Sequence, residues 1–409
     1  MRFFTREEIN KFLNEHNYDI RVSHNGRWID QKCTPDVVTI IADCIANYVS
    51  EIGNEPFSSM DIWHNEYTAD NVEDIFKKPN PDEEKARNEY DKFFQQPMEM
   101  LANALILNKT KCGNRNFYSV ANQEMLEFIS LGDRKALMFI QCYVEKVLTD
   151  SNIIGVFNTF FDNDIKINFE NMKETFEDFT IANTRINGKT ECRRIFTKVI
   201  NPLAFLHGKL GTEKGHLSQH KITYDMLMYN RDNFRDNYAN KPKDMTRNEY
   251  AETVGIHVNG NLTKYMSQRA KRIVRTYNEQ FRRGITEVMN DTNHIGDLAT
   301  HIHHIFPEAE YPEICMYLEN LIALTPTQHF NYAHPNGNTQ KINRDYQQIC
   351  LLAKSCVVRE DIEQHEDPIY DFTKFLFVCC VGLDNEAFNE IENGDYDGVV
   401  TAINLAYAV

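Results

Sequence analysis

Residues 300–306 read THIHHIF, and this short stretch constrains the chain more than any other. Three of the 14 histidines occupy four consecutive positions, in a setting of isoleucine, threonine and phenylalanine that is typical of a strand. Pro307 follows and must end the strand, because proline has no amide hydrogen to donate. Since core strands rarely carry so many imidazoles, we expect these histidines to have a chemical role.

The residues after Pro307 predict the elements around that strand. A loop of about a dozen residues, with turn residues at its start, leads to a second apolar strand, NLIALT at 320–325. Thr325 followed by Pro326 is typical of a helix start, with a hydroxyl cap and proline at the first helical position. The predicted order is therefore strand, loop, strand and helix.

The polar positions in these elements fit a site that hydrolyses phosphodiesters, which needs an activated water, a cation and a rigid frame. His303 and His304 are adjacent on a strand, so their side chains point to opposite faces. His329 lies one turn into the following helix and can complete a two-histidine metal site with His303. Asn320 begins the second strand, where its amide can hydrogen-bond across the hairpin and hold the loop that aims His304.

This pattern resembles the HNH, or ββα-metal, nuclease motif. His304 precedes Asn320 by 16 residues and Asn320 precedes His329 by 9, both usual spacings in that family. The segments HHIFP and ENLIALTPTQH resemble sequences found in type II restriction endonucleases of the HNH class. The resemblance implies that His304 is the general base and Asn320 the structural asparagine of the catalytic site. It also implies that His303 and His329 bind a divalent cation.

One departure from the family concerns a third metal histidine, which some members carry four residues after the position of His329. Here that position is Ala333, and His334 lies roughly 140° around an α-helix from His329. We therefore expect that His334 is not a ligand. A two-histidine site favours a loosely held Mg²⁺, although imidazoles also accept Mn²⁺, Ni²⁺ or Zn²⁺. The zinc-knuckle cysteines of many small HNH domains are absent.

The charge distribution allows contact with nucleic acid despite a net charge of −16. Residues 1–100 hold 11 Lys and Arg against 20 Asp and Glu, and residues 351–409 hold 3 against 12. The acidity is therefore confined to the two ends, while residues 261–290 carry seven basic and two acidic residues. A local basic stripe matters more for phosphate contact than the net charge does.

Basic residues in two regions are the candidate DNA contacts. The spacing of apolar positions predicts one long helix over 261–290, with the basic residues on its other faces. Residues 206–236, rich in glycine and histidine, are expected to form a loop. This second region and RWIDQKCTPDVV at 27–38 both resemble sequences of HNH restriction enzymes. The candidate phosphate contacts are Arg269, Lys271, Arg272 and Arg275 in the helix, and Lys214, Arg231 and Arg235 in the loop region.

We expect an α+β, mainly helical chain whose C-terminal half contains the nuclease motif. Over residues 34–130, three short helices followed by a strand are compatible with a winged-helix-like module, and equally with an ordinary helical domain. The expected regions are a DNA-recognition region (1–130), a helical middle region (131–260), a basic helix with the nuclease core (261–350), and an acidic helical region packing on that core (351–409).

Ten cysteines occur without a CxxC pair, which indicates reduced thiols rather than a disulfide framework or a zinc ribbon. The longest apolar run, FLFVCCVGL at 375–383, is too short to cross a membrane. The N-terminus is charged too early for a signal peptide. These features favour a cytoplasmic protein without a membrane partner.

The function that the sequence predicts is site-specific cleavage of double-stranded DNA within a restriction system. One active site cuts one strand, so we expect a homodimer on DNA, and a DNA methyltransferase as a genetic partner. Three alternatives stay open: a DNA-binding protein with a non-catalytic hairpin, a nuclease for modified DNA, and a different nuclease site at Asp30, Lys32 and Asp36. The last has its elements in reversed order relative to the PD-(D/E)xK motif.

Overall fold

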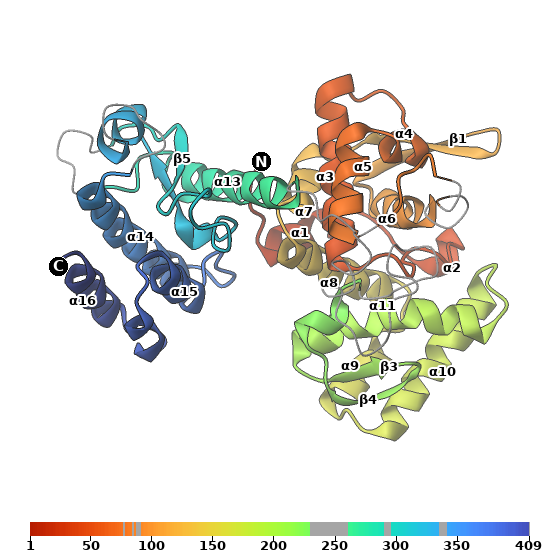
Figure 1. Cartoon of the computed structure of the whole chain (residues 1–409). Coiled ribbons are helices and arrows are strands. Elements are labelled where there is room, and N and C mark those ends of the chain that lie inside the picture. The colour runs from red at the N-terminus through yellow and green to blue at the C-terminus, as the bar shows by residue number, and fades with distance from the viewer. Residues whose placement is uncertain are drawn as a thin grey trace. The chain divides into compact units, whose positions relative to one another are not determined.

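The computed structural model describes residues 1–76, 78–83, 86, 91–229, 261–289, 296–334 and 342–408 (Figure 1). The described chain is mainly helical with three two-stranded antiparallel sheets, which confirms the expected mainly helical α+β class. It divides into two compact units, one covering Phe3–Asn259 and the other Gly260–Val409. This division matches the expected boundary at 260. The finer boundaries at 130 and 350 fall inside the units and stay predictions.

The first half of the N-terminal unit is built around α3, which follows the N-cap Thr34 and has Pro35 at its first helical position. This helix is buried along most of its length and packs against α6, α7 and α8. The strand β2 is followed closely by the helix α7. The elements are α1 (Arg6–Asn14), α2 (Ile20–Ser23), α3 (Pro35–Ile52), α4 (Ser59–Trp63), α5 (Glu66–Phe76), α6 (Asp91–Asn103), β1 (Leu107–Cys112), β2 (Arg115–Val120) and α7 (Gln123–Ser130).

The second half of this unit is mainly helical from α8 to α11, as expected for the start of the middle region, but it corrects the prediction for 206–236. That region was expected to be a loop, but it holds the β3–β4 hairpin. The turn residues Lys214 and Gly215 both have positive φ, 52° and 84°, which suits a tight two-residue hairpin turn. The elements are α8 (Asp133–Asp150), α9 (Ile154–Asp162), α10 (Lys166–Asn183), α11 (Lys189–His207), β3 (Leu210–Glu213), β4 (His216–Lys221) and η2 (Tyr224–Leu227).

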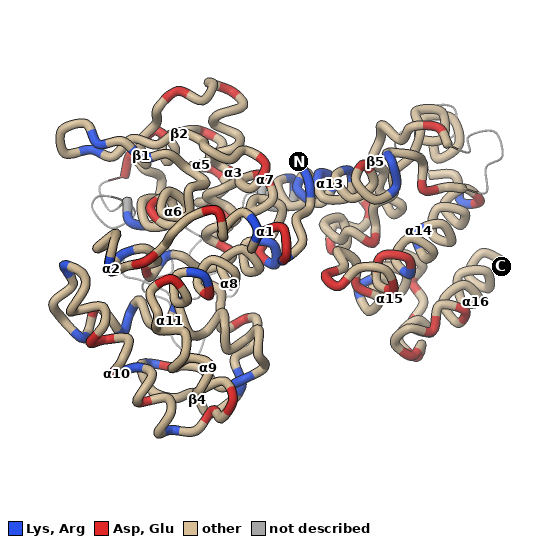
Figure 2. The backbone as a smooth tube through the Cα atoms, turned by 180° about the vertical axis from the view of Figure 1, so that it is seen from behind, with Lys and Arg blue, Asp and Glu red and all other residues tan. Residues whose placement is uncertain are grey.

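The C-terminal unit begins with the basic helix, which is shorter than predicted. The helix α13 ends at Phe281, because Arg283 and Gly284 adopt left-handed conformations that no α-helix contains. Lys and Arg recur along α13 (Figure 2). The elements are α13 (Asn261–Phe281), β5 (His301–His304), η3 (Leu318–Asn320), β6 (Leu321–Leu324), η4 (Gln328–Ala333), α14 (Arg344–Gln364), α15 (Phe372–Gly382), η6 (Glu386–Glu390) and α16 (Tyr396–Tyr407).

The segment after α13 and the helix α14 together support the hairpin β5–β6. The amide of Glu287 donates to the carbonyl of Ala323 in β6, and the amide of Ala323 donates to Glu287 Oε1, at 3.3 Å. The other oxygen, Oε2, forms a fully buried ion pair of 2.6 Å with Lys354 of α14. Gln347, also on α14, donates to the carbonyl of Ile305 at 2.8 Å. The helix α14 is therefore part of the frame of the hairpin.

All ten cysteines lie in the described residues and none forms a disulfide, as the sequence predicts. No helix in the described part of the chain combines the length and apolar character that crossing a bilayer requires.

Candidate metal centre and catalytic histidine

The register of β5 and β6 sets the directions of the histidines. His303 pairs with Ile322 and His304 with Leu321, so the two imidazoles leave the strand on opposite faces. Every residue of β6 is buried, and its apolar side chains pack the hairpin into the unit. The predicted sequence of strand, loop, strand and helix is confirmed. Both strands are shorter than predicted, because only four residues of each pair in the ladder.

The helix after β6 starts at the predicted cap and then changes type. The Thr325 hydroxyl accepts from the amide of Gln328, and the Gln328 side chain accepts from the amide of Thr325, both at 3.1 Å. This reciprocal pair satisfies two of the amides that a helix start leaves without partners. From Gln328 to Ala333 the turn is a π-helix, in which backbone hydrogen bonds join residues five positions apart.

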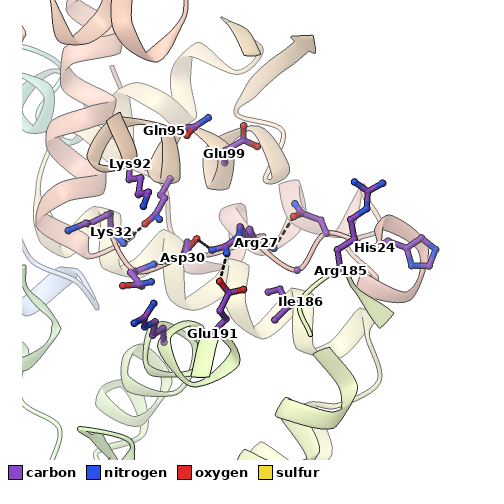
Figure 3. Close-up of a pocket in the computed structure, with 15 residues that line it drawn as sticks. His24, Arg27, Asp30, Lys32, Lys92, Gln95, Glu99, Arg185, Ile186 and Glu191 are labelled. Atoms are coloured by element: carbon purple, nitrogen blue, oxygen red, sulfur yellow. Dashed lines mark hydrogen bonds and ion pairs between the residues drawn. The ribbon is translucent and has the colours of Figure 1, made fainter. Parts of the chain in front are cut away.

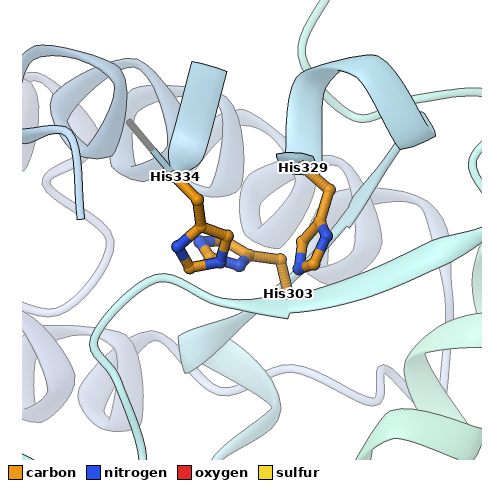
Figure 4. A group of neighbouring side chains, drawn as sticks. All are labelled: His303, His329 and His334. Atoms are coloured by element: carbon orange, nitrogen blue, oxygen red, sulfur yellow. The ribbon is translucent and has the colours of Figure 1, made fainter. Parts of the chain in front are cut away.

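Three imidazoles converge beside this turn (Figure 4). One ring nitrogen from each of His303, His329 and His334 lies within 4.8 Å of the others. The ring centroids are 5.2 Å apart for His303 and His329, and 5.0 Å apart for each pair that includes His334. Three imidazoles at this spacing form a group that could hold a metal ion.

The inclusion of His334 corrects the expectation that it points away from His329. That expectation assumed an α-helix, in which five residues give roughly 140° of rotation. The π-turn instead brings the fifth residue back over the first, and His334 itself has an extended backbone with φ −117° and ψ 102°. Pro335 explains the extended backbone, because proline disfavours a helical conformation in the residue before it. His334 is only 5% exposed.

Burial favours the neutral form of two of these imidazoles, His303 and His329. The pKa of His303 lies well below its usual value, first because the ring is buried and then because His329 and His334 are close. Burial, reinforced by His334 and His301, lowers the pKa of His329 to about 4. Neutral imidazole is the form that binds a metal. In addition, Nδ1 of His329 is buried and has no hydrogen-bond partner within the described residues, which leaves it available to a ligand.

His304 lies on the other face with different neighbours. Its Nε2 is 3.0 Å from the carbonyl oxygen of Cys315 and 3.4 Å from the Ser267 hydroxyl, which also donates to Glu308. Because a carbonyl only accepts, Nε2 carries the proton and Nδ1 keeps the basic lone pair. Burial, together with Lys271, lowers the pKa of His304 even though Cys315 and Glu308 oppose the shift. The ring is therefore a neutral base at neutral pH.

Asn320 makes the hydrogen bonds that its place in the sequence predicts. It is fully buried, and its Oδ1 accepts from the amide of Phe306 at 2.8 Å. Its Nδ2 donates to the carbonyls of Phe306, at 3.1 Å, and Ile314, at 3.3 Å. These bonds close both ends of the loop that carries the Cys315 carbonyl toward His304.

Replacing Asn320 with Ala is expected to destabilise the C-terminal unit by about 2 kcal/mol, because it leaves buried polar groups of Phe306 and Ile314 without partners. Urea unfolding of the full chain measures this change. The surface variant Asn389→Ala serves as the control. Equal unfolding midpoints for the two variants would show that the loop does not depend on Asn320.

The remaining histidine of the strand, His301, stacks on His329 with ring centroids 4.9 Å apart and an angle of 18°. Phe330 packs against both rings, at 5.0 Å and 4.6 Å. His301 is outside the group of three that could hold a metal. Its observed role is to pack beside His329.

The predicted DNA contacts fall in different places. Arg231 and Arg235 lie outside the described residues. Lys214 occupies the β3–β4 turn of the N-terminal unit. The other four, Arg269, Lys271, Arg272 and Arg275, are on α13 of the C-terminal unit. Of these, Lys271 is the one whose positive charge contributes to lowering the pKa of His303, His304 and His329.

Sequence reasoning missed His334, Ser267 and Glu308 in this centre. The proline after His334 was the signal that could have found it, because it places that residue outside any α-helix. Ser267 and Glu308 have no such signal, since they reach His304 only through the packing of α13 and the loop after β5.

No protein-family model, no curated protein and no solved structure matches this chain. The interpretation of the centre therefore rests on its own geometry.

Proposed function

We propose that the chain is a metal-dependent endonuclease that cuts double-stranded DNA at specific sites, as the enzyme of a restriction system. The observation that carries this proposal is the division of roles across one strand. A three-histidine group lies on one face of β5, and a neutral histidine with a fixed tautomer lies on the other. A metal site with a purely structural role does not require a neutral histidine with a fixed tautomer on the opposite face of the strand.

The residues divide the chemistry of an HNH, or ββα-metal, nuclease between them. A divalent cation held by His303, His329 and His334 would stabilise charge on the phosphate and the leaving oxygen. His304 accepts a proton at Nδ1 from the water whose oxygen forms the new bond to phosphorus. The bond from phosphorus to the leaving sugar oxygen breaks, and that oxygen takes a proton from solvent. Asn320 holds the loop that orients His304.

The third histidine changes the expected metal. Mg²⁺ prefers oxygen ligands in an octahedral arrangement and keeps its own waters. Three imidazoles suit borderline ions such as Mn²⁺, Ni²⁺, Co²⁺ or Zn²⁺. We therefore propose a transition metal in place of the Mg²⁺ that two ligands favoured.

The rest of the chain fits the same proposal. We assign target recognition to the N-terminal unit, with its helices followed by the β1–β2 hairpin as a winged-helix-like module. Cutting both strands with one centre per chain calls for two chains on the DNA. A methyltransferase encoded beside the gene would protect the host sites.

The test is digestion of plasmid DNA by the full chain with Mn²⁺, Co²⁺, Ni²⁺, Zn²⁺ or Mg²⁺, followed by sequencing of the ends. Linear fragments with common end sequences are expected with at least one transition metal, and none with EDTA. Specific DNA binding without cleavage in every metal would favour the non-catalytic alternative. Cleavage only of methylated plasmid would favour the nuclease for modified DNA.

A further inference from the structure

The N-terminal unit contains a cleft of about 790 Å³ that no part of the proposed cleavage chemistry uses (Figure 3). It is formed by residues 24–32, which follow α2, and by α6, residues 185–186 and the start of α11. These residues come from three stretches that are distant in sequence, 24–32, 92–99 and 185–194. Four of its lining residues, at 27 and 30–32, belong to the stretch RWIDQKCTPDVV.

The charges of the cleft leave a positive excess. Arg27 neutralises two of the three acidic lining residues, Asp30 at 2.6 Å and Glu191 at 3.2 Å. The third, Glu99, is paired with Lys109 at 2.6 Å, outside the lining. The acidic groups are therefore already occupied by cations.

Three further cations line the cleft without such partners. Lys92, Arg185 and Arg194 make no hydrogen bond or ion pair with any described residue. Their side chains are exposed. A concave surface with three cations that lack partners attracts an anion, and in particular one with repeated negative charges.

The uncharged residues of the lining indicate which kind of anion fits the cleft. It carries the side-chain amides of Gln31 and Gln95, and Ile186 is its one apolar residue among those described. Among the described lining residues there is no Phe, Tyr or Trp, and the imidazole of His24 lies with its Nδ1 2.9 Å from the carbonyl oxygen of Asn183. Pockets for a flipped base, and grooves for single strands, use aromatic rings for stacking. Cations with amides instead suit duplex DNA, where cations contact phosphates and amides read base edges.

We propose that this cleft is the surface on which the chain holds duplex DNA for recognition. Lys92, Arg185 and Arg194 contact backbone phosphates, while Gln31 and Gln95 face base edges. The inference rests on the proposed function, because it names the part of the chain that selects the DNA to be cut.

The first experiment measures binding of the full chain to a labelled random-sequence duplex in EDTA, over a range of salt concentrations. The test variant is the triple Lys92→Ala, Arg185→Ala and Arg194→Ala. Loss of three phosphate contacts should reduce the slope of log K against log salt by about 3 and weaken binding about 100-fold at 0.15 M salt. A control triple on the same unit, Lys11→Ala, Lys166→Ala and Lys221→Ala, removes equal charge outside the cleft. It should bind within about twofold of wild type.

The outcomes separate this inference from the proposed function. If both triples bind like wild type, or lose affinity equally, the cleft is not the DNA surface, whatever the result of plasmid cleavage. Loss of single-stranded binding with unchanged duplex binding would also overturn it. If the chain cuts no DNA in any metal but the cleft triple alone loses duplex affinity and salt slope, the cleft assignment stands and the nuclease proposal fails.

A second variant tests base reading. The double substitution Gln31→Ala and Gln95→Ala should leave the affinity for random duplex within about twofold, since it removes no phosphate contact. The set of sequences cut in a plasmid should broaden. If the set of cut sequences is unchanged, the side-chain amides of Gln31 and Gln95 do not read bases.

Discussion

Replacing His304 with Ala is expected to lower the rate of DNA cleavage by roughly 10³-fold, because a positioned general base contributes about 10² to 10⁴. Metal uptake should be unchanged, since His304 lies on the opposite face of β5 from the three-histidine group. Duplex affinity in EDTA should be unchanged as well. Single-turnover cleavage of plasmid DNA, metal titration and duplex binding measure the three quantities.

Two further variants make the result for His304 decisive. His304→Gln keeps an N–H near the position of Nε2 that can donate to the Cys315 carbonyl but has no basic nitrogen, so it should be as slow as His304→Ala. His220→Ala, on the exposed strand β4, should cleave at the wild-type rate. Cleavage by His304→Gln at more than about a tenth of the wild-type rate would mean that another group accepts the proton.

Replacing His334 with Ala is expected to weaken transition-metal binding about 100-fold. Structural zinc sites of four ligands bind with about 10–16 kcal/mol, or roughly 3 kcal/mol for each ligand. Cleavage by His334→Ala should recover when the metal concentration is raised by the same factor. Titration with Co²⁺, followed by its visible absorption, measures the affinity and reports a change in ligand number at the same time.

The matched control is His301→Ala, which removes an imidazole beside His329 that is not in the group of three. Its affinity for Co²⁺ should stay within about threefold of wild type. If wild type and His334→Ala have equal affinities for Co²⁺, His334 is not a ligand, and the two-histidine site that the sequence alone predicts is correct.

The same titration has an expected pH dependence. Ordinary histidines, with a pKa near 6.5, would be mostly protonated at pH 5.5, so protons would compete with the metal for the ring nitrogens. Because burial lowers the pKa of His329 to about 4 and that of His303 well below its usual value, both stay neutral there. Metal uptake should therefore persist at pH 5.5 and weaken as the pH falls toward about 4. A loss of affinity near pH 6.5 would contradict the burial of the site.

The local parts of the centre could be predicted from the sequence because they depend on neighbouring residues. Strand alternation places His303 and His304 on opposite faces whatever surrounds the strand. Thr325 and Pro326 fix the start of the helix, and so the position of His329. The helices α8 to α11 at the start of the middle region could be expected for the same reason, since periodic apolar positions define helices locally.

The remaining features depend on geometry that spacing rules do not contain. His334 joins the group because the turn is a π-helix, and rotation per residue was taken from an α-helix. The end of α13 was placed too late because the left-handed residues Arg283 and Gly284 interrupt a pattern that otherwise continues. The cleft of the N-terminal unit joins three stretches far apart in the chain, which no local pattern connects.

The buried ion pair between Glu287 and Lys354 has a consequence for any shortened form of this chain. Fusion enzymes are often built by moving a catalytic cassette onto a new DNA-binding partner, and the sequence suggests a cassette ending near residue 350. Such a cut would remove Lys354 and leave the Glu287 carboxylate buried under β6 without its cation, at a cost of about 3–5 kcal/mol. The portable unit is the whole of Gly260–Val409.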